Sequence, residues 1–249
     1  MALEAVALLG LMCLLYVAAV GWSAGREIDD AARPEEEDGT FWRALLAVPV
    51  ESLGVPTFVL AGAVAIVVAR RRGTRATAAV AGILIGPSLS AWLLELVILG
   101  GLDPLGAEHL RPLGVGFFPS GHATAAMSLA IAAILIAPPR HRRLAGALAA
   151  AYAAAIGVGL VAVDSHTPSD ILGGYLLAAA WGVAMVAVAP SGGAGLAPGA
   201  APVAGAATAL GLLASATIDP PAAGAAAFAL GAGGLSAVAF ALIALLQRR

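Results

Sequence analysis

Long apolar runs separated by short polar segments are the feature that most constrains how this chain can fold. A helix needs roughly 20 mostly apolar residues to cross the hydrocarbon core of a bilayer. Six runs of about this length cover residues 2–22, 44–69, 76–100, 119–137, 144–163 and 170–189. Two weaker runs, built mostly from Ala and Gly, cover residues 201–217 and 222–246. The sequence therefore predicts an all-α polytopic membrane bundle, with a six-helix core over residues 1–189, a Gly/Pro linker over 190–200 and two additional transmembrane helices over 201–249.

The composition supports this interpretation and narrows the function. Hydrophobic residues make up 61% of the chain and charged residues only 11%, whereas a soluble domain averages roughly 25% charged residues. No Lys-rich tract or basic–aromatic mixture is present, so we expect no nucleic-acid partner. The four His and the single Cys13 have no metal-ligand spacing, so we expect neither a metal site nor a cofactor, and one Cys excludes an intrachain disulfide.

The N-terminal part of the chain leaves two choices open. The first run reads as a retained helix rather than a cleaved signal peptide, because its start lacks the positive charges of such peptides. The acidic segment 23–43 follows and ends in Phe41 and Trp42 before Arg43. We interpret it as a solvated loop with an aromatic anchor at the membrane interface. The alternative is a lid over a site on that side of the membrane.

The distribution of positive charge predicts which side is cytoplasmic. All thirteen basic residues are Arg. With eight spans, one side receives nine of them: Arg70, Arg71, Arg72, Arg75, Arg140, Arg142, Arg143, Arg248 and Arg249. The other side receives Arg26, Arg33, Arg43 and Arg111. The positive-inside rule makes the first side, with both termini, cytoplasmic. The abundance of Ala, Gly and Arg indicates a GC-rich bacterial genome, so we expect a bacterial plasma membrane.

The first motif is Phe118-Pro119-Ser120-Gly121-His122, at the start of the fourth run. We expect Pro119 in the first turn of a helix, where its missing N–H costs nothing. Ser120 and Gly121 would then offer a hydroxyl and unobstructed backbone N–H groups at the positive end of the helix dipole, which is an anion site. His122 could supply a proton to the group that carries the anion. The alternative is an ordinary helix start with an interfacial His.

The second motif is His166-Thr167-Pro168-Ser169-Asp170, at the start of the sixth run. Thr167 is expected to cap the helix, with Pro168 at its first position and Asp170 completing a capping box. That role alone explains Asp170 but not His166. A carboxylate four residues away can hold one imidazole nitrogen and leave the other free as a nucleophile or base.

The two motifs are separated by one helix, a basic turn and a returning helix, so both histidines return to the same membrane surface, predicted to be the outer one. Phosphoryl transfer through a phosphohistidine requires such a pair of histidines, with one of them backed by an acid.

Pro-Ser-Gly-His followed one hairpin later by His-xxx-Asp resembles the type 2 phosphatidic acid phosphatase (PAP2) superfamily, which includes lipid phosphate phosphatases. The resemblance covers residues 2–189. It implies that His166 is the nucleophile, Asp170 its orienting partner and His122 the acid that protonates the leaving group, with Ser120 and Gly121 contacting phosphate. The implied substrate is a membrane lipid phosphate or pyrophosphate, such as a polyprenyl or glycerolipid carrier.

The chain departs from the family pattern in its basic residues. The first family motif, Lys-x6-Arg-Pro, has no Lys here: if Arg111-Pro112 is its end, Pro104 stands at the Lys position, and another register places Glu95 and Gly101 at the basic positions. The Ser-Arg of the third motif is replaced by Gly159 and Leu160. Arg111 is then the best remaining phosphate-binding cation.

Losing one donor to a transition-state oxyanion typically costs on the order of 10²–10³ in rate. The alternative to a phosphatase is therefore a catalytically impaired member of the family that serves as a lipid-binding or interaction subunit. A carrier that uses Glu95 or Asp103 is a third hypothesis, supported only by the presence of acids in a membrane protein.

Overall fold

The computed structural model describes residues 2–31, 41–97 and 118–187. Helices and no strands occur in these residues, so the predicted all-α membrane bundle is confirmed. The linker over 190–200, the two C-terminal helices over 201–249 and Arg111 lie outside the described residues. The predicted domain boundaries therefore stay a prediction.

The six runs of the expected core correspond to helices in the order in which they were expected. The helices are α1 (Ala2–Tyr16) with the π-helical turn η1 (Val17–Gly21), α2 (Ser23–Ala31), α3 (Phe41–Ser52), α4 (Val55–Arg70), α5 (Thr74–Val97), α6 (Gly121–Ile136), the short 3-10 turn η4 (Pro139–His141), α7 (Arg142–Ala162) and α8 (Pro168–Val186). Within the described residues, four segments are long and apolar enough to cross a membrane: Ala2–Gly21, Thr74–Val97, Pro139–Ala162 and Pro168–Val186. The bent pair α3–α4 gives a fifth, and α6 is a shorter apolar helix.

The second run does not form one straight helix. Ala44–Ser52 and Val55–Arg70 are bent by 53° relative to each other. The break falls just before Pro56, which has no N–H to continue the hydrogen-bond ladder of α3, and Gly54 adopts an extended conformation as the N-cap of α4.

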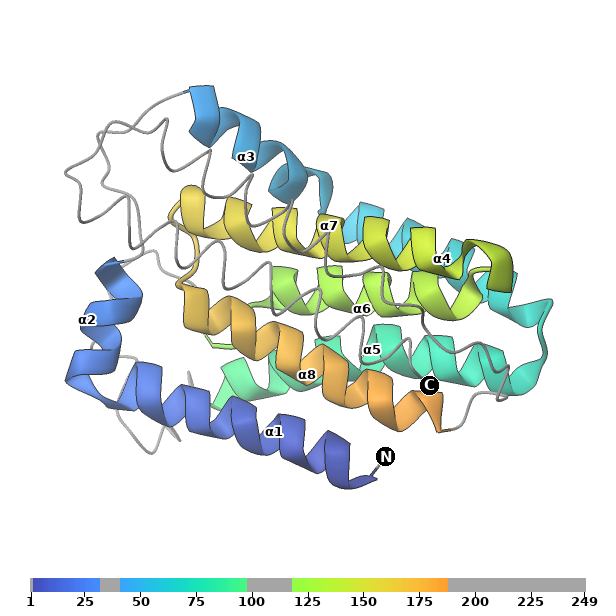
Figure 1. The fold of residues 1–249 in the computed structure, drawn as a ribbon, viewed down its shortest axis with the longest axis horizontal. Helices are drawn as coiled ribbons and strands as arrows, with labels where there is room; N and C mark the ends of the chain where they lie inside the picture. Colours follow the sequence, from blue (N-terminus) through green and yellow to red (C-terminus); the bar gives the residue numbers. More distant parts are fainter. Residues whose placement is uncertain (1, 32–40, 98–117, 188–249) are drawn as a thin grey trace.

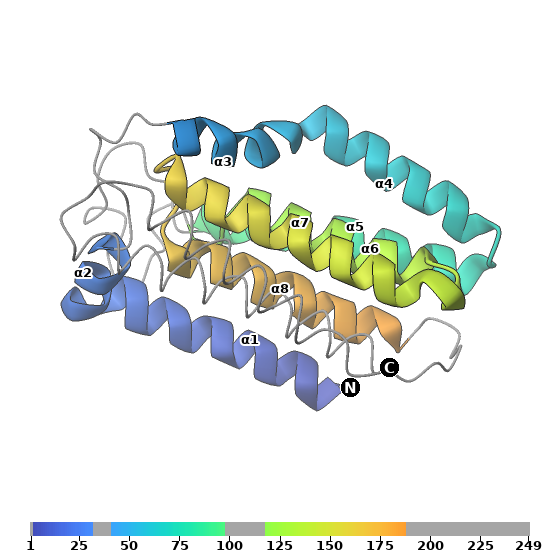
Figure 2. The same ribbon diagram turned by 45° about the horizontal axis from the view of Figure 1, so that its top comes forward.

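Apart from α2, which runs across the others, the helices lie roughly along one long axis, so their connections gather at the two ends of the bundle (Figure 1). The α7–α8 turn and α2 lie at one end, and the α4–α5 and α6–α7 turns lie at the other. α1 packs along α8, and α6 contacts α5, α7 and α8, as the second view also shows (Figure 2). Seven of the Arg residues in the described part of the chain fall at the α4–α5 and α6–α7 end: Arg70, Arg71, Arg72, Arg75, Arg140, Arg142 and Arg143.

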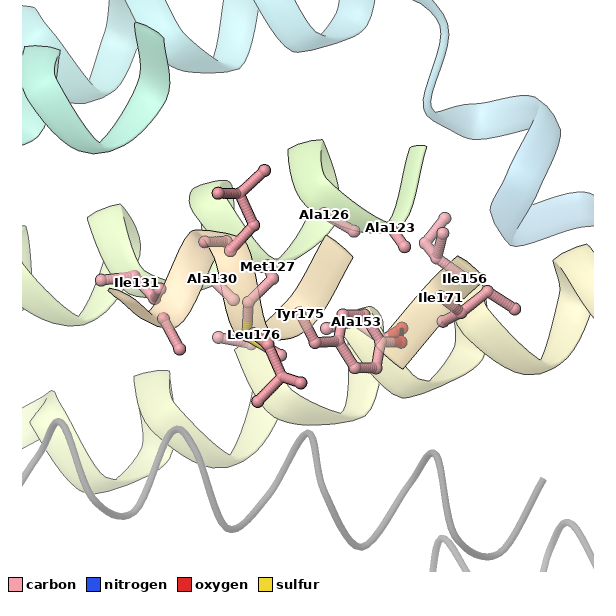
Figure 3. Close-up of a cluster of buried hydrophobic side chains, with 14 of the residues drawn as sticks. Ala123, Ala126, Met127, Ala130, Ile131, Ala153, Ile156, Ile171, Tyr175 and Leu176 are labelled. Carbon is pink, nitrogen blue, oxygen red and sulfur yellow. Dashed lines mark hydrogen bonds between the residues drawn. The ribbon is translucent and has the colours of Figure 1, made fainter. Parts of the chain in front are cut away.

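Small residues let the central helices approach closely. Figure 3 shows side chains of α6, α7 and α8 meeting in one buried cluster around Tyr175, which is fully buried. The Tyr175 hydroxyl donates a hydrogen bond to the Ala153 carbonyl of α7. A Cβ on Gly157 would collide with that hydroxyl, and a Cβ on Gly174 would lie 2.8 Å from the Ser120 carbonyl oxygen. Glycine at these positions therefore sets the spacing of α6, α7 and α8.

The interpretation of residues 23–43 as a solvated loop is wrong for its first part. Ser23–Ala31 forms helix α2, and Phe41 begins α3. α2 lies at the same end of the bundle as the α7–α8 turn (Figure 1). The alternative interpretation, a lid over a site on that side of the membrane, stays a prediction.

Candidate active site

The first motif forms the entrance to α6. Ser120 is the N-cap, and its hydroxyl accepts a hydrogen bond from the Ala123 N–H at 3.3 Å. Because this cap starts the helix at Gly121, the expectation that Pro119 lies in the first turn is wrong: Pro119 precedes the cap. Gly121 and His122 are exposed, and a Cβ on Gly121 would meet nothing within 4 Å. The first N–H groups of α6 are thus accessible from outside the bundle.

The second motif forms the entrance to α8 as its sequence predicts. Thr167 is the N-cap, Pro168 occupies the first turn and Asp170 completes a capping box. The Thr167 N–H donates to Asp170 Oδ2 at 3.3 Å. This capping box by itself holds the Asp170 carboxylate in place, independently of any contact with His166.

A backbone hydrogen bond joins the two motifs. The Ser120 N–H donates to the Asp170 carbonyl at 2.9 Å. Gly174, one turn further along α8, lets the helices approach at this level, because any side chain there would meet the Ser120 carbonyl. The N-termini of α6 and α8 are therefore neighbours, with their positive dipole ends at the same end of the bundle.

His166 is held by Asp170. Its Nδ1 lies 3.4 Å from Asp170 Oδ2, a distance at the long end of a hydrogen bond. Asp170 is fully buried and His166 is 9% exposed. The carboxylate therefore favours the tautomer with a proton on Nδ1, which leaves Nε2 with its lone pair. The His166 N–H bonds back to the Leu160 carbonyl at 3.4 Å, which anchors the residue to the end of α7.

His122 and His166 stand at the two helix entrances that the Ser120–Asp170 hydrogen bond joins. The structure thus brings together five of the six residues singled out from the sequence: Ser120, Gly121, His122, His166 and Asp170. The sixth, Arg111, is outside the described residues.

Two further acids, Glu95 and Asp29, interact with residues of the second motif. Glu95 of α5 interacts electrostatically with His166 and Asp170. Asp29 of α2 accepts hydrogen bonds from the Ser169 N–H at 2.9 Å and from the Ser169 hydroxyl at 2.5 Å. Sequence reasoning missed Asp29 because it was one of seven acids in an apparent loop, 140 positions from Ser169.

Burial raises the pKa of Asp29. Hydrogen bonds from Ser169 and Thr167 oppose that shift, and the negative charge of Asp170 adds to it. The Asp29 carboxylate is therefore held at the start of α8 with part of its hydration lost.

Gly159 and Leu160 stand where the third family motif has Ser and Arg, and both positions are packed inside the bundle. A Cβ on Gly159 would collide with the Leu46 carbonyl of α3, and Leu160 is buried in the core. These two positions of α7 therefore offer no cation to the site. The described residues also contain no group of three or more His, Cys, Asp or Glu side chains that could hold a metal ion.

Comparison with known proteins agrees with the two motifs. A family model described as PAP2 superfamily matches residues 103–192. No curated protein and no solved structure matches the chain significantly. The family match is shorter than residues 2–189, over which the motifs imply the resemblance, but it contains both histidines and the helices α6, α7 and α8 that carry them. Residues 103–192 are therefore similar to the PAP2 superfamily, and this similarity suggests a phosphatase-type activity for this membrane protein.

Proposed function

We propose that the protein is an integral membrane phosphatase that hydrolyses a lipid phosphate or pyrophosphate through a phosphohistidine on His166. The observation that carries the proposal is the hydrogen bond from the Ser120 N–H to the Asp170 carbonyl at 2.9 Å. It joins an accessible helix N-terminus, which suits a phosphate, to the start of the helix whose Asp170 holds His166.

The residues divide the reaction into two steps. His166 Nε2 attacks phosphorus, so an N–P bond forms while the bond from phosphorus to the lipid oxygen breaks. His122 gives its proton to the departing oxygen, and Asp170 stabilises the positive charge that develops on the His166 ring. Water then attacks the phosphorus, its proton passes to His122, and inorganic phosphate leaves as His166 is regenerated.

The first turn of α6 supplies stabilisation of the phosphoryl oxygens in this proposal. Gly121 and His122 are exposed residues at the positive end of the α6 dipole, and their N–H groups would donate to the equatorial oxygens of the transition state. Arg111, with the positive charge of its guanidinium, is proposed as the additional clamp.

The site is proposed to face the outside of a bacterial plasma membrane. The support is the asymmetry of charge: the seven Arg of the α4–α5 and α6–α7 turns are at the end of the bundle opposite to α2 and the α7–α8 turn (Figure 1). By the positive-inside rule, the Arg-rich end is cytoplasmic. The substrate headgroup would then be reached from the outer leaflet.

The test is phosphate release by the purified full-length protein in detergent, with phosphatidic acid, lysophosphatidic acid and a short polyprenyl diphosphate as substrates. We expect release from at least one of them, and His166→Ala should abolish it. His141→Ala is the matched control, because His141 is exposed at the other end of the bundle. Equal activity of the His166→Ala variant and the wild type would contradict the proposal.

A second candidate is a catalytically impaired protein that binds lipid phosphates without turning them over. The observation that favours it is the acidity of the described site: Glu95 and Asp170 both interact with His166, and Leu160 stands where the family has a cation. This candidate predicts that lipid phosphates raise the melting temperature of the protein in detergent while no phosphate is released from them.

A further inference from the structure

The two contacts that orient the Asp170 carboxylate are long. Its Oδ2 atom accepts from the Thr167 N–H at 3.3 Å and lies 3.4 Å from His166 Nδ1, whereas N–H···O bonds in proteins are usually roughly 2.7–3.2 Å long. One oxygen therefore serves two partners near the limit of hydrogen bonding. A small shift of the turn over residues 166–170 would separate Asp170 from His166, so whatever else holds this turn also controls the histidine.

Asp29 of α2 holds this turn at Ser169, the residue next to Asp170. Asp29 Oδ1 accepts from the Ser169 N–H at 2.9 Å, and Oδ2 accepts from the Ser169 hydroxyl at 2.5 Å. Both contacts are shorter than the two that Asp170 makes, and hydrogen bonds to a charged group are roughly twice as strong as neutral ones. Ser169 itself is buried, 2% exposed. The turn is therefore tied firmly to a helix that lies 140 positions earlier in the chain.

Asp29 also sets the direction of the hydrogen bonds between the hydroxyl groups of the turn. The Ser169 hydroxyl has one proton, and it donates that proton to Asp29. In the 3.3 Å contact between the Thr167 and Ser169 hydroxyls, Thr167 is therefore the donor. Thr167 Oγ1 then keeps its lone pairs for the Asp170 N–H, which it accepts in the capping box. The cap that carries Asp170 is thus ordered by an acceptor on α2.

The position of Asp29 is fixed by the way α2 packs on the segment before it. The Arg26 guanidinium donates to the Val20 carbonyl of η1 at 2.7 Å. A Cβ on Gly25 would collide with the Ala18 carbonyl, so glycine at this position lets α2 lie against η1. α1, which leads into η1, packs along α8. In this docked position, α2 presents Asp29 to α8 from a supported helix.

We propose that Asp29 is a positioning residue for the His166–Asp170 pair: through Ser169 it holds the turn so that Asp170 Oδ2 faces His166 Nδ1. The inference rests on the proposed function, because the orientation of His166 affects turnover only if His166 is the nucleophile. Asp29 acts through Ser169 and is not proposed to touch the substrate. Without Asp29 the His166 ring divides between its two tautomers, and only the tautomer with a lone pair on Nε2 can attack phosphorus.

The tautomer of His166 tests the proposal without turnover. We would record ¹⁵N spectra of the full-length protein labelled at histidine, in detergent and in mildly alkaline buffer, where a free imidazole is uncharged. The signals missing from His166→Ala identify His166. The wild type should show a protonated Nδ1 and an unprotonated Nε2, and Asp29→Ala should move both signals toward those of a tautomer mixture.

Glu27→Ala is the matched control, because it removes a negative charge from an exposed position of α2, and it should leave the His166 signals unchanged. Asp29→Asn keeps the size of the side chain but cannot accept at both positions, so it should change the signals as Asp29→Ala does. It replaces Asp29→Ala if that variant does not fold. A loss of packing alone would lower the melting temperature without changing the tautomer. Wild-type His166 signals in a folded Asp29 variant would overturn the proposal.

Kinetics test whether Asp29 acts through Ser169. With a lipid phosphate that the wild type hydrolyses, Asp29→Ala should lower kcat on the order of tenfold, because a misplaced nucleophile reacts more slowly, and KM should stay nearly unchanged. The double variant Asp29→Ala with Ser169→Ala should be no slower than Asp29→Ala alone, since both changes break one contact. Additive losses, or an effect on KM in place of kcat, would contradict positioning through Ser169.

The two readouts separate this proposal from the proposed function. Altered His166 signals in Asp29→Ala, together with no phosphate release by the wild type, would refute the phosphatase and keep the positioning role. Phosphate release at the same rate by the wild type and Asp29→Ala, with unaltered His166 signals, would keep the phosphatase and refute the positioning role.

Discussion

The two histidines of the site have different surroundings, and these surroundings suit different tasks. His166 is almost fully buried, and its Nδ1 faces the buried Asp170. His122 is exposed in the first turn of α6, and no carboxylate among residues 2–31, 41–97 and 118–187 is hydrogen-bonded to its ring. An imidazole fixed by a carboxylate suits a nucleophile, whereas an imidazole open to solvent suits proton exchange with a leaving group and with water.

This division of labour predicts that the effect of removing His122 depends on the leaving group. His122→Ala should lower kcat for a lipid phosphate by roughly 10²–10⁴-fold, the usual contribution of a general acid. For p-nitrophenyl phosphate, whose leaving group needs little protonation, the loss in the phosphorylation step should be much smaller. Burst-phase kinetics with both substrates measure the rate of the phosphorylation step, and so the loss caused by His122→Ala. Equal losses for the two substrates would exclude His122 as the acid.

A second prediction concerns the carboxylate behind His166. Asp170→Asn keeps the size of the side chain but removes the charge that stabilises a positively charged His166 ring. We expect kcat to fall by on the order of 10² or more, as when a preorganised electrostatic group is removed. Glu27→Gln, an equivalent neutralisation on exposed α2, is the control and should retain full activity. A fully active Asp170→Asn protein would remove Asp170 from the mechanism.

Which of these residues the sequence reveals depends on how local their contacts are. Thr167, Pro168 and Asp170 form a capping box within four positions, so the pattern predicts it directly. Asp29 and Glu95 reach the site only through the packing of α2 and α5. Sequence spacing holds no signal for such long-range contacts, and the acidic segment around Asp29 resembles any solvated loop.

At the scale of elements, the close approach of α6 and α8 holds the site together. A Cβ on Gly174 would lie 2.8 Å from both the Ser120 carbonyl oxygen and Thr124 Oγ1, and 3.0 Å from the Thr124 nitrogen. Gly174→Ala should therefore push the helices apart at the level of the Ser120–Asp170 hydrogen bond and cost about 1–3 kcal/mol of stability, as overpacking does.

Thermal unfolding in detergent and phosphate release measure the effect of Gly174→Ala. Both the melting temperature and the activity should fall. Gly10→Ala on α1 is the matched control, since a Cβ there meets nothing within 4 Å, and it should leave both unchanged. A Gly174→Ala protein as stable and active as the control would show that the spacing of α6 and α8 is not critical.

The docking of α2 should depend on pH. The pKa of Asp29 is raised in the docked state, chiefly by burial, with Asp170 adding its negative charge. Docked α2 therefore binds the Asp29 proton more tightly than released α2 does. Docking is strongest below the ordinary pKa of Asp29 and weakens as pH rises through the raised value. The mobility of a spin label at position 27 should rise over that range, and Asp29→Asn should flatten the response. A label that becomes more mobile on acidification would contradict the sign.

The elements themselves were largely predictable, because hydrophobic length decides whether a helix can span a bilayer. The six apolar runs coincide with α1, α3–α4, α5, α6, α7 and α8. The hydrophobic pattern missed two features of the helices. The break before Pro56 lies inside the second apolar run, just after Glu51 and Ser52, and α2 has too few apolar residues to be recognised as a helix by its length alone.

For the whole molecule, the asymmetry of Arg between the two ends predicts orientation. Single-cysteine variants in a Cys13→Ser background test it: position 27 lies at the α2 end, and position 71 lies in the exposed, Arg-rich α4–α5 turn. A membrane-impermeant maleimide should label Glu27→Cys in intact cells and Arg71→Cys only after permeabilisation. The reverse pattern would place the site on the cytoplasmic side and contradict the proposed outer-leaflet substrate.

The central claim is that phosphate passes through His166, and trapping the phosphoenzyme tests it most directly. Brief incubation of the full-length protein with a ³²P-labelled lipid phosphate, followed by an alkaline quench, should leave label on the protein that is stable to alkali and lost in acid, as a phosphohistidine is. The His166→Ala variant should carry none, and His141→Ala should be labelled like the wild type. Substrate turnover without such a label, or label that persists in His166→Ala, would contradict the account.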